Sequence, residues 1–123
     1  MNYIKTIIII LCISVIKISA TITAIDQFIV GPNPFIIGSS NLVINLVTST
    51  DISSAYYLYS ASGELIFTRS YTSGETNSES GTNKFILATA SELSTIRAGL
   101  YILHAIYASD DTSIYKKAYI IAN

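Results

Sequence analysis

The sequence predicts an all-β fold, an immunoglobulin-like antiparallel β-sandwich of about seven strands in residues 21–123. Three observations predict it. Short segments rich in Ile, Val, Leu, Tyr, Phe and Thr alternate with clusters of Gly, Asn, Asp and Ser, as strands alternate with turns. The segments recur at a spacing of roughly 10–15 residues, which is typical of a sandwich. No segment of the predicted domain has a convincing helical period, so βαβ units are not expected.

Residues 1–20 are expected to be a secretory signal peptide rather than part of the fold. Lys5 precedes an almost wholly apolar run, Thr6–Ile16, of about 11 residues, whereas a membrane span needs about 20. Cleavage is expected after Ala20, with Ala24 as the second choice. An uncleaved N-terminal anchor is the alternative. Export would make the protein secreted, periplasmic or bound to the cell surface, with membrane contact only during export.

The first two predicted strands lie on either side of a proline-rich turn. Thr23–Val30 is closed by Gly31-Pro32-Asn33-Pro34, where neither proline can donate a ladder hydrogen bond. Asn41–Val47 follows, and its Leu and Ile residues alternate with mostly polar ones. A period of two with one polar face indicates a half-buried strand.

The next predicted strands form a hairpin and a return. Ser54–Ser60 and Glu64–Tyr71 are joined by Ala61–Gly63, where glycine permits a positive φ. Thr72–Asn83 contains two glycines and no aliphatic residue, so it is predicted to be a solvated loop that tolerates replacement. Lys84–Thr89 is the fifth predicted strand.

The last part of the chain is predicted to end in a second hairpin. Ala90–Ala98 is ambiguous and could hold one helical turn before Gly99. Leu100–Ala108 is the most continuous apolar run of the predicted domain, so we expect it at the centre of a sheet with both faces covered. Asp110–Thr112 is predicted to turn the chain, and Ser113–Ile121 is predicted to pair with that central strand.

Four blocks of sequence, in order, resemble a known module. They are Pro32-Asn33-Pro34-Phe35, Leu58–Ile66, Ala98–Leu103 and Tyr115–Ile120. Together they are similar to the C-terminal sorting domains of the type IX secretion system and to the related immunoglobulin-like module of flagellar hook-capping proteins. By this resemblance, the residues with a structural role are Pro32, Asn33, Pro34, Phe35, Gly63, Gly99 and Tyr101.

The resemblance implies a bacterial, non-enzymatic module that acts in secretion, in cell-surface attachment or in assembly of an envelope structure. Its partner would be a protein of a secretion or envelope-assembly apparatus. Ser60 replaces the family's usual acidic residue and Glu64 its usual Arg, so the ion pair across that hairpin is absent here. Family members usually follow a large cargo domain, whereas this module is expected to stand alone behind its signal peptide.

The sequence holds little catalytic equipment, and no enzymatic activity is expected. His104 could act as a base, but no carboxylate lies near it in sequence, so we expect it on the outward face of a strand. Asp110 and Asp111 could bind calcium, which needs six to eight oxygen ligands. Adjacent aspartates are far more often turn formers, so no metal site is predicted. No Gly-x-Ser-x-Gly motif marks a nucleophile.

Nine tyrosines and no tryptophan are a clear bias. Tyr56 is expected to point into the core together with Leu58, which leaves Tyr57 and Tyr59 on the opposite face. Tyrosine is enriched at interfaces because it joins a large apolar ring to a hydroxyl. The tyrosines either cover the sheet without further function or recognise a glycan or protein. The second possibility gives the alternative function, a free-standing secreted binding protein with a tyrosine-rich face.

The candidate partner-binding residues are Tyr115, Lys116, Lys117 and Tyr119, all on the last predicted strand. Their parity places Tyr115, Lys117 and Tyr119 on one face and Lys116 on the other. Lysines on such a strand also hinder edge-to-edge aggregation, which is the alternative interpretation. A monomer or weak oligomer is expected, and the sequence selects no particular oligomeric state.

Overall fold

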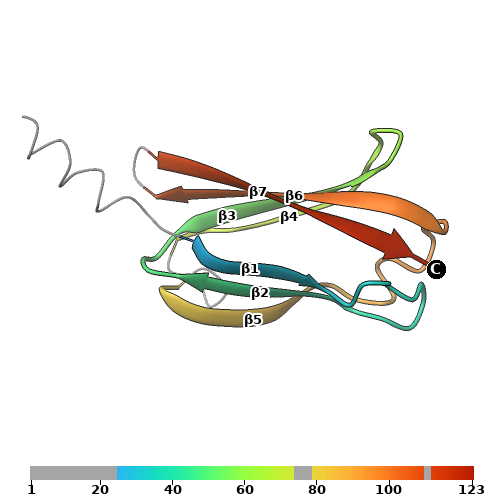
Figure 1. Cartoon of the computed structure of the whole chain (residues 1–123), viewed down its shortest axis with the longest axis horizontal. Coiled ribbons are helices and arrows are strands. Elements are labelled where there is room, and N and C mark those ends of the chain that lie inside the picture. Colours follow the sequence, from blue (N-terminus) through green and yellow to red (C-terminus); the bar gives the residue numbers. More distant parts are fainter. Residues whose placement is uncertain (1–24, 74–78, 110–111) are drawn as a thin grey trace, which may run out of the picture.

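The computed structural model describes residues 25–73, 79–109 and 112–123. The predicted signal peptide and its cleavage site lie outside these ranges. The described residues form two antiparallel sheets packed face to face (Figure 1). No helix in these ranges has the length and apolar character needed to cross a membrane. The strands are β1 (Ile25–Gly31), β2 (Leu42–Thr48), β3 (Ser53–Ser60), β4 (Leu65–Tyr71), β5 (Gly81–Ala88), β6 (Gly99–Ser109) and β7 (Thr112–Ala122).

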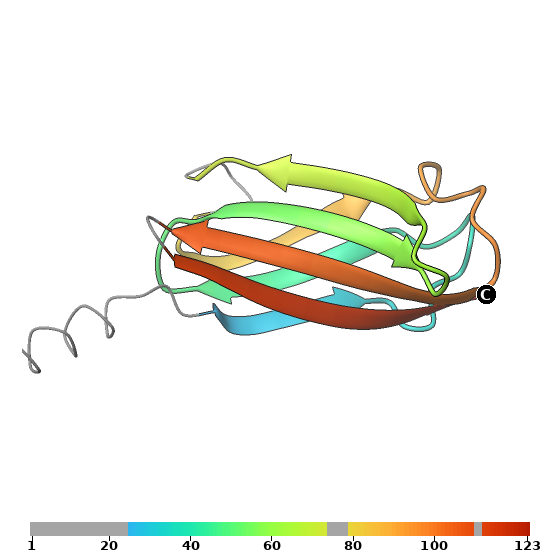
Figure 2. The ribbon, with the colours of Figure 1, turned by 90° about the horizontal axis from the view of Figure 1, so that it is seen from above.

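The sheet order confirms the predicted fold class. One sheet has three strands in the order β1-β2-β5, and the other has four in the order β4-β3-β6-β7. Every neighbouring pair is antiparallel. Figure 2 shows the four-stranded sheet with β4 and β7 at its two edges. The described residues therefore form a seven-stranded antiparallel β-sandwich with an immunoglobulin-like division of strands.

Alternate residues of the facing strands build the core, as the period of two predicts. Tyr56 and Leu58 of β3 point inward, which confirms that prediction, and they meet alternate residues of β6 from the same sheet. The Tyr107 hydroxyl donates a hydrogen bond of 3.1 Å to the Tyr56 hydroxyl. Burial raises the pKa of Tyr56 to about 12 and raises the pKa of Tyr107 as well. The largest fully buried side chains include Tyr56, Tyr107, Phe35, Leu42, Ile44, Leu46, Leu87 and Leu103.

The prediction that Thr72–Asn83 is a loop is wrong at the C-terminal end of this segment. β5 begins at Gly81 instead of Lys84, because the ladder with β2 continues through three residues that have no aliphatic side chain. Asn83 is buried, and its side-chain amide donates to the Glu79 carbonyl oxygen at 2.8 Å. This hydrogen bond offsets the loss of water and makes the buried amide acceptable. Residues 74–78 of the predicted loop lie outside the described ranges.

The expectation that both faces of Leu100–Ala108 are covered is also wrong. β6 is a central strand and pairs with β7, as predicted, and its other neighbour is β3, but only one of its faces packs against the other sheet. Ile102, His104 and Ile106 point outward and are partly exposed. A sandwich has two layers, so each sheet keeps one face toward solvent wherever no further element covers it.

The two remaining turn predictions have different outcomes. The ambiguous segment Ala90–Ala98 forms hydrogen-bonded turns and holds no helix, although the Leu93 N–H donates to the Thr89 carbonyl oxygen at 3.2 Å. β7 pairs with β6 throughout, as predicted. Asp110 and Asp111, the predicted turn residues of that hairpin, lie outside the described part of the chain.

Candidate interaction surface

The outer face of the four-stranded sheet carries most of the predicted recognition residues. Cross-strand pairing fixes their arrangement, because residues directly opposite one another share a face. We call the tyrosine-bearing part of this face the aromatic face. Three rows of side chains define it, Ala55–Ile106–Tyr115, Tyr57–His104–Lys117 and Tyr59–Ile102–Tyr119.

Ring contacts order one half of the aromatic face. The rings of Tyr57 and Tyr59 are stacked with centroids 6.5 Å apart and an interplanar angle of 22°. His104 meets Tyr59 edge to face at 5.3 Å between centroids. His104 thus lies on the outward face, as predicted, with Tyr57 and Lys117 as its cross-strand neighbours. These rings form a shallow platform on rigid strands.

The other half of the aromatic face belongs to β7 and is more exposed. Tyr115 is 70% exposed and Tyr119 is 58% exposed. Lys117 lies between them on the same face and is exposed too. Lys116 points to the opposite side, where it lies across from Ala105 and is half-buried at the margin of the core. The structure therefore brings Tyr115, Lys117 and Tyr119 together and separates Lys116 from them.

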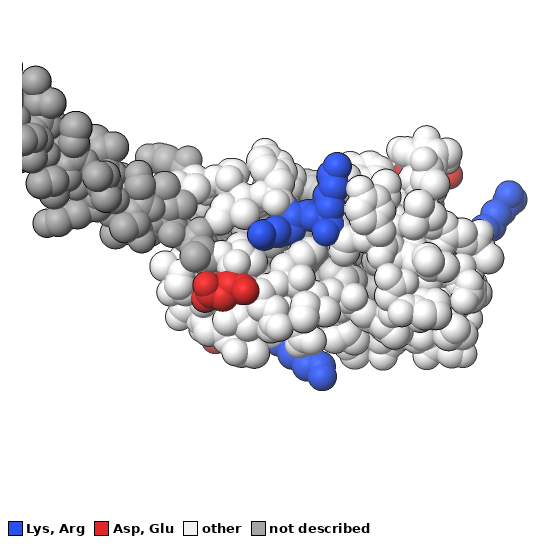
Figure 3. Space-filling view, in the orientation of Figure 1, with Lys and Arg blue, Asp and Glu red and all other residues white. Residues whose placement is uncertain are grey.

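Charge is sparse around this surface. Figure 3 shows one side of the molecule, in the orientation of Figure 1, as mostly uncharged, with a few basic and acidic side chains. In the described ranges, the one ion pair within 4.0 Å joins Arg69 to Glu92 at 2.7 Å. The Thr89 N–H, with Arg69 beside it, holds the pKa of the Glu92 carboxyl below its usual value. The two lysines of β7 therefore form no such pair with the described residues.

The proline-rich turn fastens the C-terminal half of β7. The Asn33 side chain donates from Nδ2 to the Tyr119 carbonyl oxygen at 3.0 Å and accepts at Oδ1 from the Ile121 N–H at 3.1 Å. Phe35 is buried, donates to the Ile121 carbonyl oxygen at 2.7 Å and pairs with Ala122 in a parallel bridge. The Pro-Asn-Pro-Phe block, which connects β1 to β2 of the three-stranded sheet, thus also bonds to the edge strand of the four-stranded sheet.

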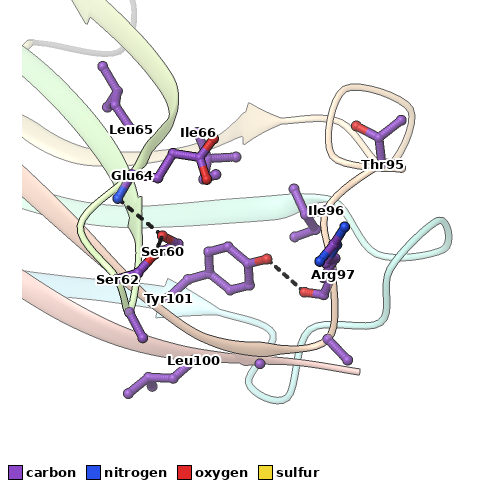
Figure 4. A pocket seen from close by; sticks show the side chains of 13 residues that line it. Ser60, Ser62, Glu64, Leu65, Ile66, Thr95, Ile96, Arg97, Leu100 and Tyr101 are labelled. Carbon is purple, nitrogen blue, oxygen red and sulfur yellow. Dashed lines mark hydrogen bonds between the residues drawn. The ribbon is translucent and has the colours of Figure 1, made fainter.

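A second candidate site is an open groove at the end of the sandwich near the C-terminus. Its volume is about 750 Å³. Its walls are the β3–β4 hairpin and the segment that leads into β6 (Figure 4). The Tyr101 hydroxyl donates to the Arg97 carbonyl oxygen at 2.7 Å. The Ser60 Oγ accepts from the Glu64 N–H at 3.1 Å. Its polar lining includes Ser60, Ser62, Glu64, Thr95, Arg97 and Tyr101.

The remaining residues that the resemblance marks as structural are Gly99 and Tyr101, which line the groove, and Gly63, which lies in the hairpin that forms its other wall. Gly63 has φ of +91° in the turn of the β3–β4 hairpin, a conformation that glycine adopts without strain. Gly99 and Tyr101 line the opposite wall. The sequence predicted a role for each of these residues, but their meeting at one end of the sandwich depends on the fold. Asn33 and Phe35 bond to β7 instead.

Metal-binding geometry is not found among residues 25–73, 79–109 and 112–123, where no three His, Cys, Asp or Glu side chains gather. The chemistry that the aromatic face offers is noncovalent. It presents flat rings, hydroxyl groups and one ammonium group on paired strands. Rings and hydroxyls of this kind suit recognition of a protein or a sugar.

Comparison with known proteins supports the fold. No family model and no curated protein matches the sequence. Solved structures with a similar fold include the β-glucuronidase of Parabacteroides merdae, with a TM-score of 0.57 and 8% identity over 81% of this chain and 14% of that chain. A structure of the same enzyme with glycerol in its active site gives a TM-score of 0.53 and 9% identity, over 81% of this chain and 13% of that chain.

Dimeric latent PorU from Porphyromonas gingivalis also has a similar domain. The TM-score is 0.54 and the identity 17%, over 81% of this chain and 9% of that chain. The chain spans about a seventh or less of these much larger proteins. At such identities the similarity shows the fold alone.

Proposed function

We propose that this protein is a secreted, non-enzymatic interaction module that acts in secretion, cell-surface attachment or assembly of an envelope structure. The four sequence blocks that resemble type IX sorting domains support this proposal. The presence of a similar domain in PorU is consistent with it. The observation that carries the proposal is the exposed group formed by Tyr115, Lys117 and Tyr119 on one face of β7.

The physical argument rests on exposure combined with rigidity. Large aromatic side chains that remain exposed on a paired strand lose little conformational entropy when a partner covers them. Tyr115 and Tyr119 are such side chains, because β7 pairs with β6 along its whole length. Lys117 adds a positive charge between them, which can select an acidic partner surface. The partner is then a protein of the secretion or envelope-assembly apparatus.

Export is part of the proposal. It depends on residues 1–20 acting as a cleaved signal peptide, which leaves Thr21 as the first residue of the exported protein. N-terminal sequencing of material from outside the cytoplasm should then begin at Thr21. A sequence that begins at Met1 would support the uncleaved anchor instead.

The decisive experiment changes the β7 face without changing the core. In Lys117→Glu/Tyr119→Ser both changed side chains point outward, so the melting temperature should stay within a few degrees of the parent. We expect this variant to lose partner capture and retention at the cell surface. The matched control is Lys84→Glu/Ile86→Ser, an exposed pair at the same spacing on β5 of the other sheet. Equal retention in both variants would refute the proposal.

A second candidate function is glycan binding by the Tyr57–Tyr59 platform. The observation that favours it is the near-parallel stacking of the two rings, with an interplanar angle of 22°. Aromatic rings on rigid strands can pack against the apolar face of a sugar. In a glycan-binding assay, Tyr59→Ala should then abolish binding, whereas Lys117→Glu should leave it unchanged. Loss of protein capture with no glycan binding would favour the first function.

A further inference from the structure

Among the described residues, other segments hydrogen-bond to the outward edge of β7 along only half of its length. In an antiparallel pair, successive residues point their backbone groups alternately toward the neighbouring strand and away from it. The Ile121 N–H and C=O bond to Asn33 and Phe35 rather than to β6. Because the register of β6 and β7 is regular, every second residue of β7 before Ile121 also points its backbone groups away from β6.

These residues are Tyr119, Lys117, Tyr115 and Ser113. Asn33 occupies the Tyr119 carbonyl. No hydrogen bond joins the backbone of Ser113, Tyr115 or Lys117 to another segment within the described ranges. We call the stretch Ser113–Lys117 the free half-edge. At about 3.4 Å per residue it is roughly 14 Å long, enough to pair with a short strand.

Exposure makes the free half-edge accessible. Ser113, Tyr115 and Lys117 are all exposed, and β7 lies at the outer edge of its sheet (Figure 2). An unpaired strand edge is a template for another strand, and proteins use such edges to bind extended peptides. Asn33 marks the end of the template, because its side chain already fills the position of a neighbouring peptide group at Tyr119 and Ile121.

We propose that the free half-edge Ser113–Lys117 binds an extended, acidic segment of a partner protein as an additional strand of the sheet. This inference rests on the proposed function, since it states how the partner engages β7. Three residues each offer one N–H and one C=O to the incoming backbone. Lys117 and Lys116, on opposite faces of β7, then meet carboxylates on the two faces of the incoming strand.

Charge selects the acidic segment over a second copy of this chain. β7 contains two lysines and no acidic residue. Pairing between two copies would gather four lysines at one seam with no carboxylate from either strand. Like charges across a strand pair are destabilising, and edge lysines prevent such pairing. An acidic strand turns the same lysines into favourable contacts.

The probe is a fluorescein-labelled peptide, Thr-Glu-Glu-Val-Glu-Glu-Thr, blocked at both ends, which carries carboxylates on both faces of an extended strand. Fluorescence anisotropy measures its binding to the purified protein. A second peptide of the same sequence carries N-methyl groups on alternate amides, which remove the strand hydrogen bonds and keep the charge. A third peptide has Lys in place of Glu. Binding should weaken at least tenfold with either altered peptide.

Two variants locate the interaction on the protein. Tyr115→Pro removes an N–H that points away from β6, a position where an edge strand accepts proline. Tyr115→Thr is the matched control, because it removes the same ring and keeps the N–H. Binding should be lost in the proline variant and largely kept in the threonine variant. If the proline variant fails to fold, the comparison of plain and N-methylated peptides on the parent protein still decides.

Several outcomes would overturn this inference. Equal binding of the N-methylated peptide would mean that charge alone acts. Equal loss in both Tyr115 variants would mean that the ring binds the partner. If the peptide does not bind even at millimolar concentration, strand addition is wrong, and the role of the lysines is to protect the edge of β7 against aggregation. A dimer that Tyr115→Pro disrupts would identify a second copy as the occupant. If Lys117→Glu/Tyr119→Ser abolishes partner capture but Tyr115→Pro does not, the proposed function stands and strand addition is wrong.

Discussion

The buried pair Tyr56–Tyr107 makes a sharp prediction about the stability of the core. Both side chains are almost completely buried, and the Tyr107 hydroxyl donates to the Tyr56 hydroxyl at 3.1 Å. The Tyr56 hydroxyl also interacts with the Ser54 side chain. The two phenylalanine substitutions are therefore unequal, although each removes one oxygen atom from the same small cluster.

In Tyr107→Phe the hydroxyl of Tyr56 keeps Ser54 as a partner. The loss is then one net hydrogen bond, about 1 kcal/mol. In Tyr56→Phe the buried hydroxyl of Tyr107 loses its acceptor, and an unsatisfied buried group costs about 2 kcal/mol. For a domain of roughly 100 residues, each kcal/mol corresponds to about 4–8 °C in melting temperature. Tyr56→Phe should thus melt several degrees below Tyr107→Phe.

Chemical denaturation of both single variants and of Tyr56→Phe/Tyr107→Phe gives a complete double-mutant cycle. The double variant leaves neither tyrosine hydroxyl unsatisfied, so its loss should be smaller than the sum of the two single losses. A Tyr56→Phe variant no less stable than Tyr107→Phe would refute the reasoning. Strict additivity would refute it as well, because it would mean that the two hydroxyls do not interact.

Three further predictions concern pH and polar side chains. Below pH 10, Tyr56 and Tyr107 are protonated in both the folded and the unfolded chain, so these groups do not change stability with pH. Above pH 10 the unfolded chain loses these protons first, because the pKa values of both tyrosines are raised in the folded protein. Stability should then fall by up to about 1.4 kcal/mol per pH unit per tyrosine. In denaturation experiments between pH 9 and 12, the free energy of unfolding of Tyr56→Phe should fall less steeply with pH than that of the parent protein. Asn33→Ala removes both bonds to β7 and should lower stability by about 1–2 kcal/mol in the same assay; an unchanged midpoint would contradict this. Asn83→Ala should reduce stability by about 1 kcal/mol through loss of the bond to Glu79, whereas a loop residue would show no effect in thermal melts.

The sequence predicts the strands well where hydrophobic alternation is strong. β2 shows this best, since Leu42, Ile44 and Leu46 alternate with outward residues and are all buried. The start of β5 was missed because Gly81, Thr82 and Asn83 carry no aliphatic signal. Their strand conformation depends on pairing with β2, which is a tertiary effect.

The error at β6 has a different cause. Ile102 and Ile106 made both faces of the strand look apolar, so a second covering layer was expected. In the structure they lie on the aromatic face, beside tyrosines that shield part of their surface. The composition of a strand indicates how apolar its surroundings are. It does not show whether a further layer of structure or a neighbouring aromatic ring provides those surroundings.

Parity alone predicted which residues of the candidate surface share a face. It correctly separates Lys116 from Tyr115, Lys117 and Tyr119. The partial cover of the β7 edge could not be predicted in this way. Asn33 and Tyr119 are 86 positions apart in the sequence, and only the finished sandwich brings the amide to the strand edge.

The long separation between Asn33 and β7 also affects how the domain is made. Contacts so distant in sequence carry a large loop-closure entropy and form late in folding. During synthesis, the first strands emerge long before β7 is available. Until then Phe35 has no strand to bridge and the four-stranded sheet lacks its edge. The sandwich therefore closes only after its last strand has been synthesised.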